Sequence, residues 1–256
     1  MLLAIEFRLT RTTGLPNVIN LIPETRKIMK IILSLTLALL FTLNPLHAGS
    51  PFNGKDLNDW KTKPRGKNTN HWSVGVAAIN PEKTNELIAR EGSGEMVNTP
   101  SKTKGKSLDI YSEFKYGDAL IELEIMVPKG SNSGIYLHGE YEIQVLDSYG
   151  RTKLGMGDMG AIYGAKPPAT NACKKPGEWQ KYEIIFRAPQ FKDGKKVRNA
   201  RIDKVVLNGK VLQKDVELPR PTPGGLTGKE KAEGPIMFQG DHGPVAYRNI
   251  KISALK

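Results

Sequence analysis

The sequence predicts an all-β fold of two packed antiparallel sheets, a sandwich or a jelly roll, and three observations lead to that prediction. Apolar and polar residues alternate with period two in several short segments, which is the pattern of strands with one buried face. Turn signals recur about every eight to twelve residues, in a chain with 26 glycines and 17 prolines among 256 residues. No segment after residue 48 shows an apolar pattern of helical period as long as about 12 residues. Many short strands without a helix layer form a sandwich or a jelly roll.

The first 48 residues carry the pattern of a leader for export. Residues 31–43 are uncharged and mostly apolar, three basic residues come shortly before them, and Ala48 offers a small side chain for cleavage. A positive start, a short apolar segment and a small residue at the cut are typical of a secretory signal peptide. We therefore predict a signal peptide over residues 29–48 and a periplasmic or extracellular protein, with residues 1–28 as an over-long start. A buried core helix is the alternative interpretation.

Residues 49–256 are predicted to form a single domain. The one cysteine, Cys173, excludes an intramolecular disulfide and a cysteine-based zinc site. No apolar run reaches the roughly 18 to 20 residues of a membrane span. The net charge of +12 raises nucleic-acid binding as a function, but the lysines cluster in loops such as residues 102–106, with no aromatic ladder. We therefore expect no nucleic-acid partner, and the sequence makes no prediction of oligomeric state.

The strands are expected in chain order from residue 120 onward. In residues 120–127 the aliphatic side chains share one face, and Glu122 and Glu124 share the other. Asn208-Gly209 between two apolar runs predicts a tight hairpin, because both residues tolerate positive φ. The opening segment, residues 51–60, is expected to pack beside the last strand. Further strands are expected at residues 134–138, 141–146, 180–187, 205–207, 211–213, 235–239 and 245–252.

A first candidate site lies on the hairpin formed by residues 134–146. Tyr136 and His138 are expected to share a face of one strand, and Glu142 and Gln144 a face of the next, so that a hairpin places all four on one side of the sheet. Asp147 follows at the strand end, where loop residues meet the rim of the sheet. This pattern predicts a polar, hydrogen-bonding patch that contains a carboxylate. A solvent-facing edge hairpin would give a similar pattern and stays open as the alternative.

A second candidate cluster lies in the glycine-bounded turn over residues 238–244. It places Gln239, Asp241 and His242 together, just before the last predicted strand. His242 is a candidate general acid or base, because the ordinary pKa of histidine lies near 6.5. A plain turn with a structural histidine is the alternative.

Several motifs occur in the order of one known family over essentially all of residues 49–256. They are Phe52-Asn53-Gly54-Lys55-Asp56-Leu57 with Trp60, Asn132-Ser133-Gly134-Ile135-Tyr136, Tyr141-Glu142-Ile143-Gln144-Val145-Leu146-Asp147, Gly160-Ala161-Ile162-Tyr163, Pro176-Gly177-Glu178-Trp179, Asn208-Gly209, and Asp241-His242-Gly243 with Arg248-Asn249-Ile250. Through this series the chain resembles the DUF1080 family, the 3-keto-disaccharide hydrolase domain.

The resemblance implies a concanavalin A-like jelly roll whose concave face binds sugar, in an exported enzyme that acts on 3-keto-glycosides. The family pattern Glu-x-Gln-x-x-Asp is met by Glu142, Gln144 and Asp147, and the C-terminal pattern by Gln239, Asp241 and His242. One position departs from the family, because His138 stands where an arginine often follows Gly-Ile-Tyr-Leu. A histidine titrates, whereas an arginine grips hydroxyl groups through a fixed fork.

The implied chemistry is an elimination. A ketone at C3 acidifies the proton on C2, so a base removes that proton, the enolate expels the C1 substituent, and hydration of the enone completes an apparent hydrolysis. The route needs a base, a group that stabilises the enolate oxygen and a proton donor. We assign His242 or Asp147 as the base and Glu142 as the acid or a metal ligand. The expected substrate-binding residues are Tyr136, His138, Gln144, Gln239 and Asp241. A divalent cation on Glu142 and Asp147 is the candidate cofactor and would polarise the ketone.

Two other functions stay open at this point. One is direct glycoside hydrolysis by two carboxylates. The other is a non-catalytic carbohydrate-binding module of the laminin-G or lectin kind, because the same fold serves both purposes. The discriminating feature is whether Glu142, Asp147 and His242 converge in one cleft.

Overall fold

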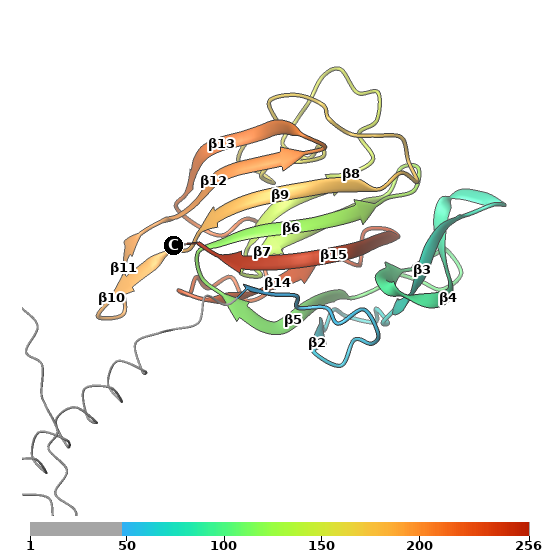
Figure 1. Cartoon of the computed structure of the whole chain (residues 1–256), viewed down its shortest axis with the longest axis horizontal. Helices are drawn as coiled ribbons and strands as arrows, with labels where there is room; N and C mark the ends of the chain where they lie inside the picture. Colours follow the sequence, from blue (N-terminus) through green and yellow to red (C-terminus); the bar gives the residue numbers. More distant parts are fainter. Residues whose placement is uncertain (1–47, 256) are drawn as a thin grey trace, which may run out of the picture. The chain divides into compact units, whose positions relative to one another are not determined.

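The computed structural model describes residues 48–255, as two antiparallel sheets and a short separate hairpin (Figure 1). The predicted signal peptide and the residues before it lie outside the described part of the chain, apart from Ala48. The large sheet runs, in order, through β13 (Lys210–Leu218), β12 (Ala200–Leu207), β9 (Gln180–Arg187), β6 (Ala119–Met126), β15 (Val245–Ala254), β4 (Lys83–Asn98) and β3 (Trp72–Asn80), with β1 (Ala48–Gly49) also on β15. The small sheet runs through β2 (Trp60–Lys63), β5 (Asp109–Tyr116), β14 (Gly234–Phe238), β7 (Asn132–Leu137) and β8 (Tyr141–Leu146). The hairpin is β10 (Gln190–Lys192) with β11 (Lys195–Arg198).

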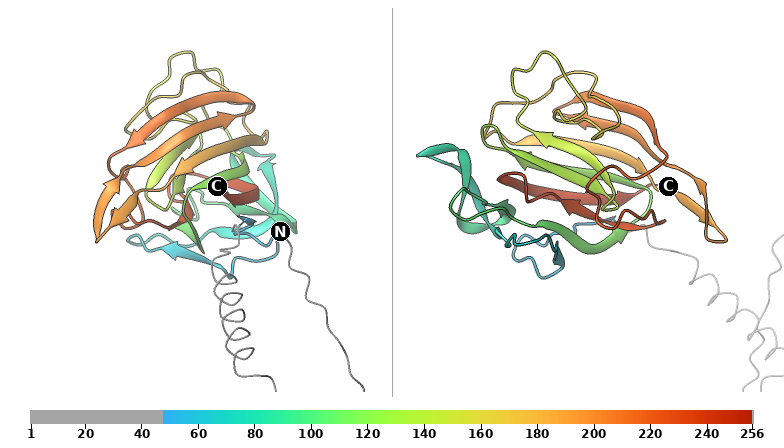
Figure 2. Two further views of the ribbon diagram at one scale, coloured as in Figure 1. Left: turned by 60° about the vertical axis from the view of Figure 1, so that its left-hand side comes forward. Right: turned by 180° about the vertical axis from the view of Figure 1, so that it is seen from behind.

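The predicted all-β sandwich is confirmed. The alternation expected at residues 120–127 appears in β6, where Ile121, Leu123 and Ile125 are buried. They face apolar side chains of the small sheet, such as Ile135 and Ile143, in one hydrophobic core. Figure 1 shows the two layers one behind the other, and Figure 2 shows them from two further directions. Burial of these aliphatic side chains, worth about 1.5 to 3 kcal/mol each, is the main force that holds the sheets together.

The predicted Asn208-Gly209 hairpin is also present. Both residues have positive φ, 51° and 80°, and they join β12 to β13. Positive φ at both central residues gives the turn a twist that matches the twist of the flanking strands, which is why Asn-Gly is favoured there.

The contacts with the last strand are made by residues 48–50, just before the predicted opening segment 51–60. β1 pairs with β15, and the hydroxyl of Ser50 donates to the carbonyl of Ile250 at 2.9 Å. Trp60 then stacks on Phe238 of the small sheet, and Phe238 stacks on Tyr247 of β15 with 3.8 Å between ring centroids. This aromatic stack connects the two sheets beneath the turn that precedes β15.

The β3–β4 ribbon was not anticipated by period-two analysis. Its outer part extends away from the sandwich (Figure 1), and most of residues 83–94 are exposed. Apart from Leu87, which is buried in a small apolar cluster, these residues bury little apolar surface, so the sequence shows no period-two apolar face there. In the part of the chain that the structure describes, no helix is long and apolar enough to cross a membrane.

A loop over residues 219–233 lies across the outer face of the small sheet. Lys63 donates from Nζ to the carbonyls of Gly224 and Gly225, both at 2.8 Å. The carboxylate of Glu140 accepts from Thr227 and from the backbone N–H of Gly228. These bonds fix the loop against the β7–β8 hairpin, and its two sides border two separate cavities.

Candidate active site

The predicted hairpin site is present on the outer face of the small sheet. Along β8 the odd-numbered side chains Tyr141, Ile143 and Val145 lie in the core, so strand alternation turns Glu142 and Gln144 to the opposite face. Both line a cavity of about 190 Å³. The full lining is Arg65, Asn132, Tyr136, Glu142, Gln144, Tyr163, Pro223, Gly224, Gln239 and His242.

The backbone of β8 is held on both sides, although β8 ends the sheet. On one side it pairs with β7, in a register that sets Tyr136 opposite Glu142 and Gly134 opposite Gln144. On the other side, residues 160–163 hydrogen-bond to Glu142 and Gln144, with Gly160 N–H donating to the Gln144 carbonyl at 2.8 Å. This loop covers the free edge of the sheet and fixes the two polar side chains in the cavity.

Glu142 is a buried carboxyl group with an unusual proton affinity. Burial raises its pKa to about 7, with neighbouring Asp109 and Asp241 adding to the rise, while the Tyr136 hydroxyl and the charge of His242 oppose it. The side chain lies over Gly134, where a Cβ would meet Glu142 Oε1 at 2.2 Å. Glycine at 134 is therefore needed to make room for this carboxyl group. A carboxyl group of this kind exchanges protons near neutral pH, as a general acid or base must.

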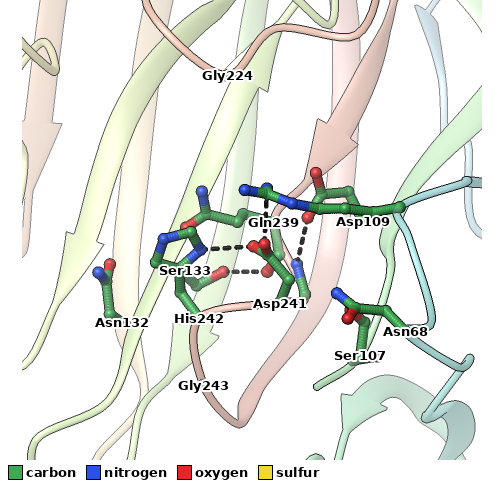
Figure 3. Close-up of polar contacts among 12 residues, drawn as sticks. Asn68, Ser107, Asp109, Asn132, Ser133, Gly224, Gln239, Asp241, His242 and Gly243 are labelled. Carbon is green, nitrogen blue, oxygen red and sulfur yellow. Dashed lines mark hydrogen bonds and ion pairs between the residues drawn. The ribbon is translucent and has the colours of Figure 1, made fainter.

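His242 is oriented by a buried carboxylate. Its Nδ1 lies 2.5 Å from Asp241 Oδ1, and the other oxygen of Asp241 lies 2.6 Å from Arg65 Nη1 (Figure 3). The Asp241 side chain is 1% exposed and that of His242 is 41% exposed. The hydrogen bond to Asp241 raises the pKa of His242. Burial alone would raise the pKa of Asp241, but His242 and Arg65 together lower it. This leaves His242 Nε2 as the ring atom free to exchange a proton in the cavity.

The turn that carries Asp241 and His242 is held by side chains from other strands. Asp109 of β5 accepts from the N–H of Gly240 at 2.9 Å, and Ser133 of β7 donates to the carbonyl of Gln239 at 2.7 Å (Figure 3). Asn98 donates to the carbonyl of Gly240 at 2.8 Å. A Cβ at Gly240 would meet the Leu108 carbonyl oxygen at 2.0 Å, so this position accepts only glycine. Burial raises the pKa of Asp109.

Amide side chains complete the polar lining. Gln144 donates from Nε2 to Asn132 Oδ1 at 2.6 Å, and its own Oε1 is buried without a hydrogen-bond partner among residues 48–255. Gln239 Nε2 lies 3.5 Å from the hydroxyl oxygen of Tyr136. A buried acceptor without a partner is costly, and a ligand hydroxyl that donates to Gln144 would remove that cost.

The structure therefore brings together most of the predicted site residues. Tyr136, Glu142, Gln144, Gln239 and His242 line one cavity, with Asp241 behind His242.

Asp147 is not among them. It follows the end of β8, and its carboxylate accepts from the N–H groups of Gly130 at 2.9 Å and Tyr149 at 3.3 Å. Asp147 thus stabilises the loops at the rim of the sheet. Glu142 and Asp147 do not converge on a common position, and within residues 48–255 no cluster of three or more His, Cys, Asp and Glu side chains is suited to hold a metal ion. Asp147 does not line the cavity that holds Glu142, and a cation on this pair stays a prediction.

His138 does not share the outer face with Tyr136 either. It lies in the β7–β8 turn with a φ of 52°, and its ring packs edge-on against Tyr116 and Phe186. The turn breaks the strand alternation on which the prediction depended. His138 borders a different cavity of about 310 Å³, on the other side of the loop over residues 219–233.

Sequence reasoning did not name several lining residues, Arg65, Asn132, Tyr163, Pro223 and Gly224, or the supporting residue Asp109, as parts of the site. Arg65 follows β2 in an irregular loop, far along the chain from its partner Asp241, so no spacing pattern connects the two. Asn132 and Tyr163 stand in the motifs Asn132-Ser133-Gly134 and Gly160-Ala161-Ile162-Tyr163, and those motifs were the available signal.

Comparison with known proteins agrees with this architecture. The 3-keto-alpha-glucoside-1,2-lyase-like domain family matches residues 47–253. A solved structure from Parabacteroides distasonis, titled a "putative glycosyl hydrolase", is 33% identical, with 81% of this chain and 84% of that chain covered and a TM-score of 0.60. A second structure from the same organism, with the same description, is 20% identical and covers 82% of this chain and 94% of its own, with a TM-score of 0.52. No curated protein matches this chain.

Proposed function

Because this chain belongs to the 3-keto-alpha-glucoside-1,2-lyase-like family, we propose that it is an exported enzyme that cleaves 3-keto-glycosides by elimination, followed by hydration of the enone. The observation that carries the proposal is the pairing, in one cavity, of a carboxyl group whose pKa is raised to about 7 with a histidine whose pKa is also raised. Two titratable groups with shifted pKa values, in one polar cavity, are typical of acid–base catalysis.

The reaction begins with proton abstraction. The ionised Glu142 carboxylate takes the proton from C2, and the electron pair of that bond moves to the C3 ketone oxygen as an enolate. Arg65 lines the cavity beside Asp241 and supplies positive charge, and Tyr136 supplies a hydroxyl donor. Donors fixed in advance where charge develops stabilise such an oxyanion without reorganisation.

The second step breaks the glycosidic bond. The enolate expels the C1 oxygen, and the His242 imidazolium gives this oxygen its Nε2 proton. Water then adds across the C1–C2 double bond, so that the net reaction is hydrolysis. This assignment exchanges the roles expected from sequence, where His242 was a candidate base and Glu142 the acid. It is favoured because Asp241 stabilises the protonated form of His242 and because His242 borders a second, larger cavity that is open to a leaving group.

The test is to incubate the purified protein with 3-keto-trehalose and with 3-keto-glucosides in D₂O, and to follow both released sugar and deuterium at C2 by NMR. We expect release together with exchange at C2, whereas the matching glucosides without the ketone stay intact because their C2 proton is not acidic. Cleavage of the unoxidised glucosides, without C2 exchange, would support direct two-carboxylate hydrolysis instead. Saturable sugar binding without turnover of any 3-keto-glycoside would leave the carbohydrate-binding module as the function.

A further inference from the structure

A second cavity, of about 630 Å³, adjoins the site on the far side of His242. Asp241 and His242 form part of its wall, together with Gly243 and Pro244, and His242 also lines the smaller cavity that holds Glu142. The rest of its lining comes from residues 83–86 at the end of the β3–β4 ribbon and from the loop over residues 100–106. Pockets for small organic ligands usually measure about 300 to 1,000 Å³. The larger cavity lies in that range, and the one beside Glu142 is smaller.

The lining of the larger cavity is positively charged. Lys83, Lys102 and Lys106 contribute ammonium groups, and the single glutamate in the lining, Glu86, lies 3.4 Å from Lys83. Among the residues that the structure describes, neither Lys102 nor Lys106 has a carboxylate within salt-bridge distance. The charge of the nearby Asp241 is balanced by Arg65 and His242. The field of Lys106 reaches the common wall, where it helps to lower the pKa of Asp241.

We propose that the larger cavity is the leaving-group subsite and that it selects 3-keto-glycosides whose aglycone carries a negative charge, a carboxylate or a phosphate. The inference rests on the proposed function. A glycoside with its keto-sugar beside Glu142 extends its C1 oxygen past His242, and the aglycone then enters the cavity that Lys102 and Lys106 line. An anionic aglycone gains from these two ammonium groups, whereas a neutral aglycone does not.

The experiment compares the 3-keto-glucosides of 3-hydroxybenzoate and 3-hydroxybenzamide, which have nearly the same shape and differ in charge. Wild type should favour the benzoate in kcat/KM by about threefold to tenfold at low ionic strength, since exposed charge pairs are individually weak. The preference should lie mostly in KM, because the lysines do not take part in proton transfer. It should diminish as salt is added.

The variant Lys102→Gln/Lys106→Gln should bring this preference close to one, because it lowers kcat/KM for the benzoate more than for the benzamide. The double change to glutamate should reverse the preference. Lys210→Gln, on an exposed strand end of the β12–β13 hairpin, is the matched control and should keep the wild-type ratio. Any difference in leaving-group reactivity between the two substrates cancels when the ratios of variant and wild type are compared.

Equal ratios for wild type and both double variants, with both glycosides cleaved, would overturn the subsite and leave the proposed function intact. Failure of wild type to cleave either glycoside would overturn the proposed function, and the subsite with it. A preference that persists in the double variants would show that the aglycone is recognised elsewhere, and would also overturn the proposal.

Discussion

The β7–β8 hairpin borders two glutamate–histidine neighbourhoods that have opposite properties. On the outer face of the hairpin, Glu142 lines a cavity with His242 from the turn before β15, and both have raised pKa values. In its turn, Glu140 is saturated by Thr227 and Gly228. His138 is packed between aromatic rings, and burial lowers its pKa to about 4.

The difference between the two neighbourhoods comes from what completes the hydrogen bonding of each group. Both carboxylate oxygens of Glu140 accept hydrogen bonds from the loop over residues 219–233, so this side chain serves to hold the loop. Glu142 is buried with fewer donors, so it is poised to exchange a proton. The carboxylate of Asp241 stabilises the protonated form of His242. His138 has a backbone carbonyl and aromatic rings beside it, and these do not stabilise its charge enough to offset burial. Identical residue types thus become structural or reactive according to their environment.

The substitution Glu142→Gln should have the largest effect, on turnover. The amide keeps the shape of the side chain and removes the proton-transfer group, so turnover of a 3-keto-glycoside should fall by about 10²- to 10⁴-fold. Glu142 has a native pKa above that of the unfolded chain, so its contribution to stability is present at low pH and is lost as pH rises through about 7. At pH 8 the free energy of unfolding of the variant should therefore exceed that of wild type by about 1 to 3 kcal/mol. Lower stability at pH 8 together with full activity would contradict both halves of this prediction.

His138 should produce an acid-dependent loss of stability. Its native pKa of about 4 lies below the ordinary 6.5, so the unfolded chain takes up a proton first, and stability falls as pH drops from about 6.5 to about 4. The total loss from this group is about 3 kcal/mol. His138→Asn, which tolerates the positive φ at this position, should flatten this dependence in urea unfolding at pH 7 and pH 4.5. An unchanged acid slope in the variant would assign the effect to other groups.

Glu140→Gln tests the structural side of the comparison. An amide cannot accept all three hydrogen bonds from Thr227 and Gly228, so the variant should lose about 1 to 3 kcal/mol of unfolding free energy. The loss should be measured by denaturant unfolding at pH 8, with Glu142→Gln as the matched substitution that does not destabilise. Equal behaviour of the two variants would mean that the two neighbourhoods do not differ as described.

The substitution Asp241→Asn should have the smallest effect, on the pH dependence of kcat/KM. Without the carboxylate, the pKa of His242 should fall, so the alkaline limb of the kcat/KM profile should move to lower pH. Activity on the alkaline side should drop about tenfold for every pH unit by which the limb moves. A profile that keeps its alkaline limb in place would remove His242 as the proton donor.

The sequence by itself determined the sandwich and one wall of the site. Period-two alternation is a local property, so it predicted β6, β8 and the side to which Glu142 and Gln144 point, and Asn208-Gly209 predicted its own turn. The motifs that carry the family resemblance located Asp241 and His242 as well. In each case the information lies within a few consecutive residues.

Only the tertiary structure decided which polar residues meet. Asp147 and His138 continue the alternating sequence pattern of their strands, but both lie just beyond a strand end. Side chains there no longer point alternately to the two faces of the sheet. Arg65 and Asp109 belong to the site because β2, β5 and the turn before β15 come together in space, and no spacing along the chain records that. The raised pKa of Glu142 is likewise a product of burial by segments from across the fold, including the loop that Glu140 and Lys63 hold in place.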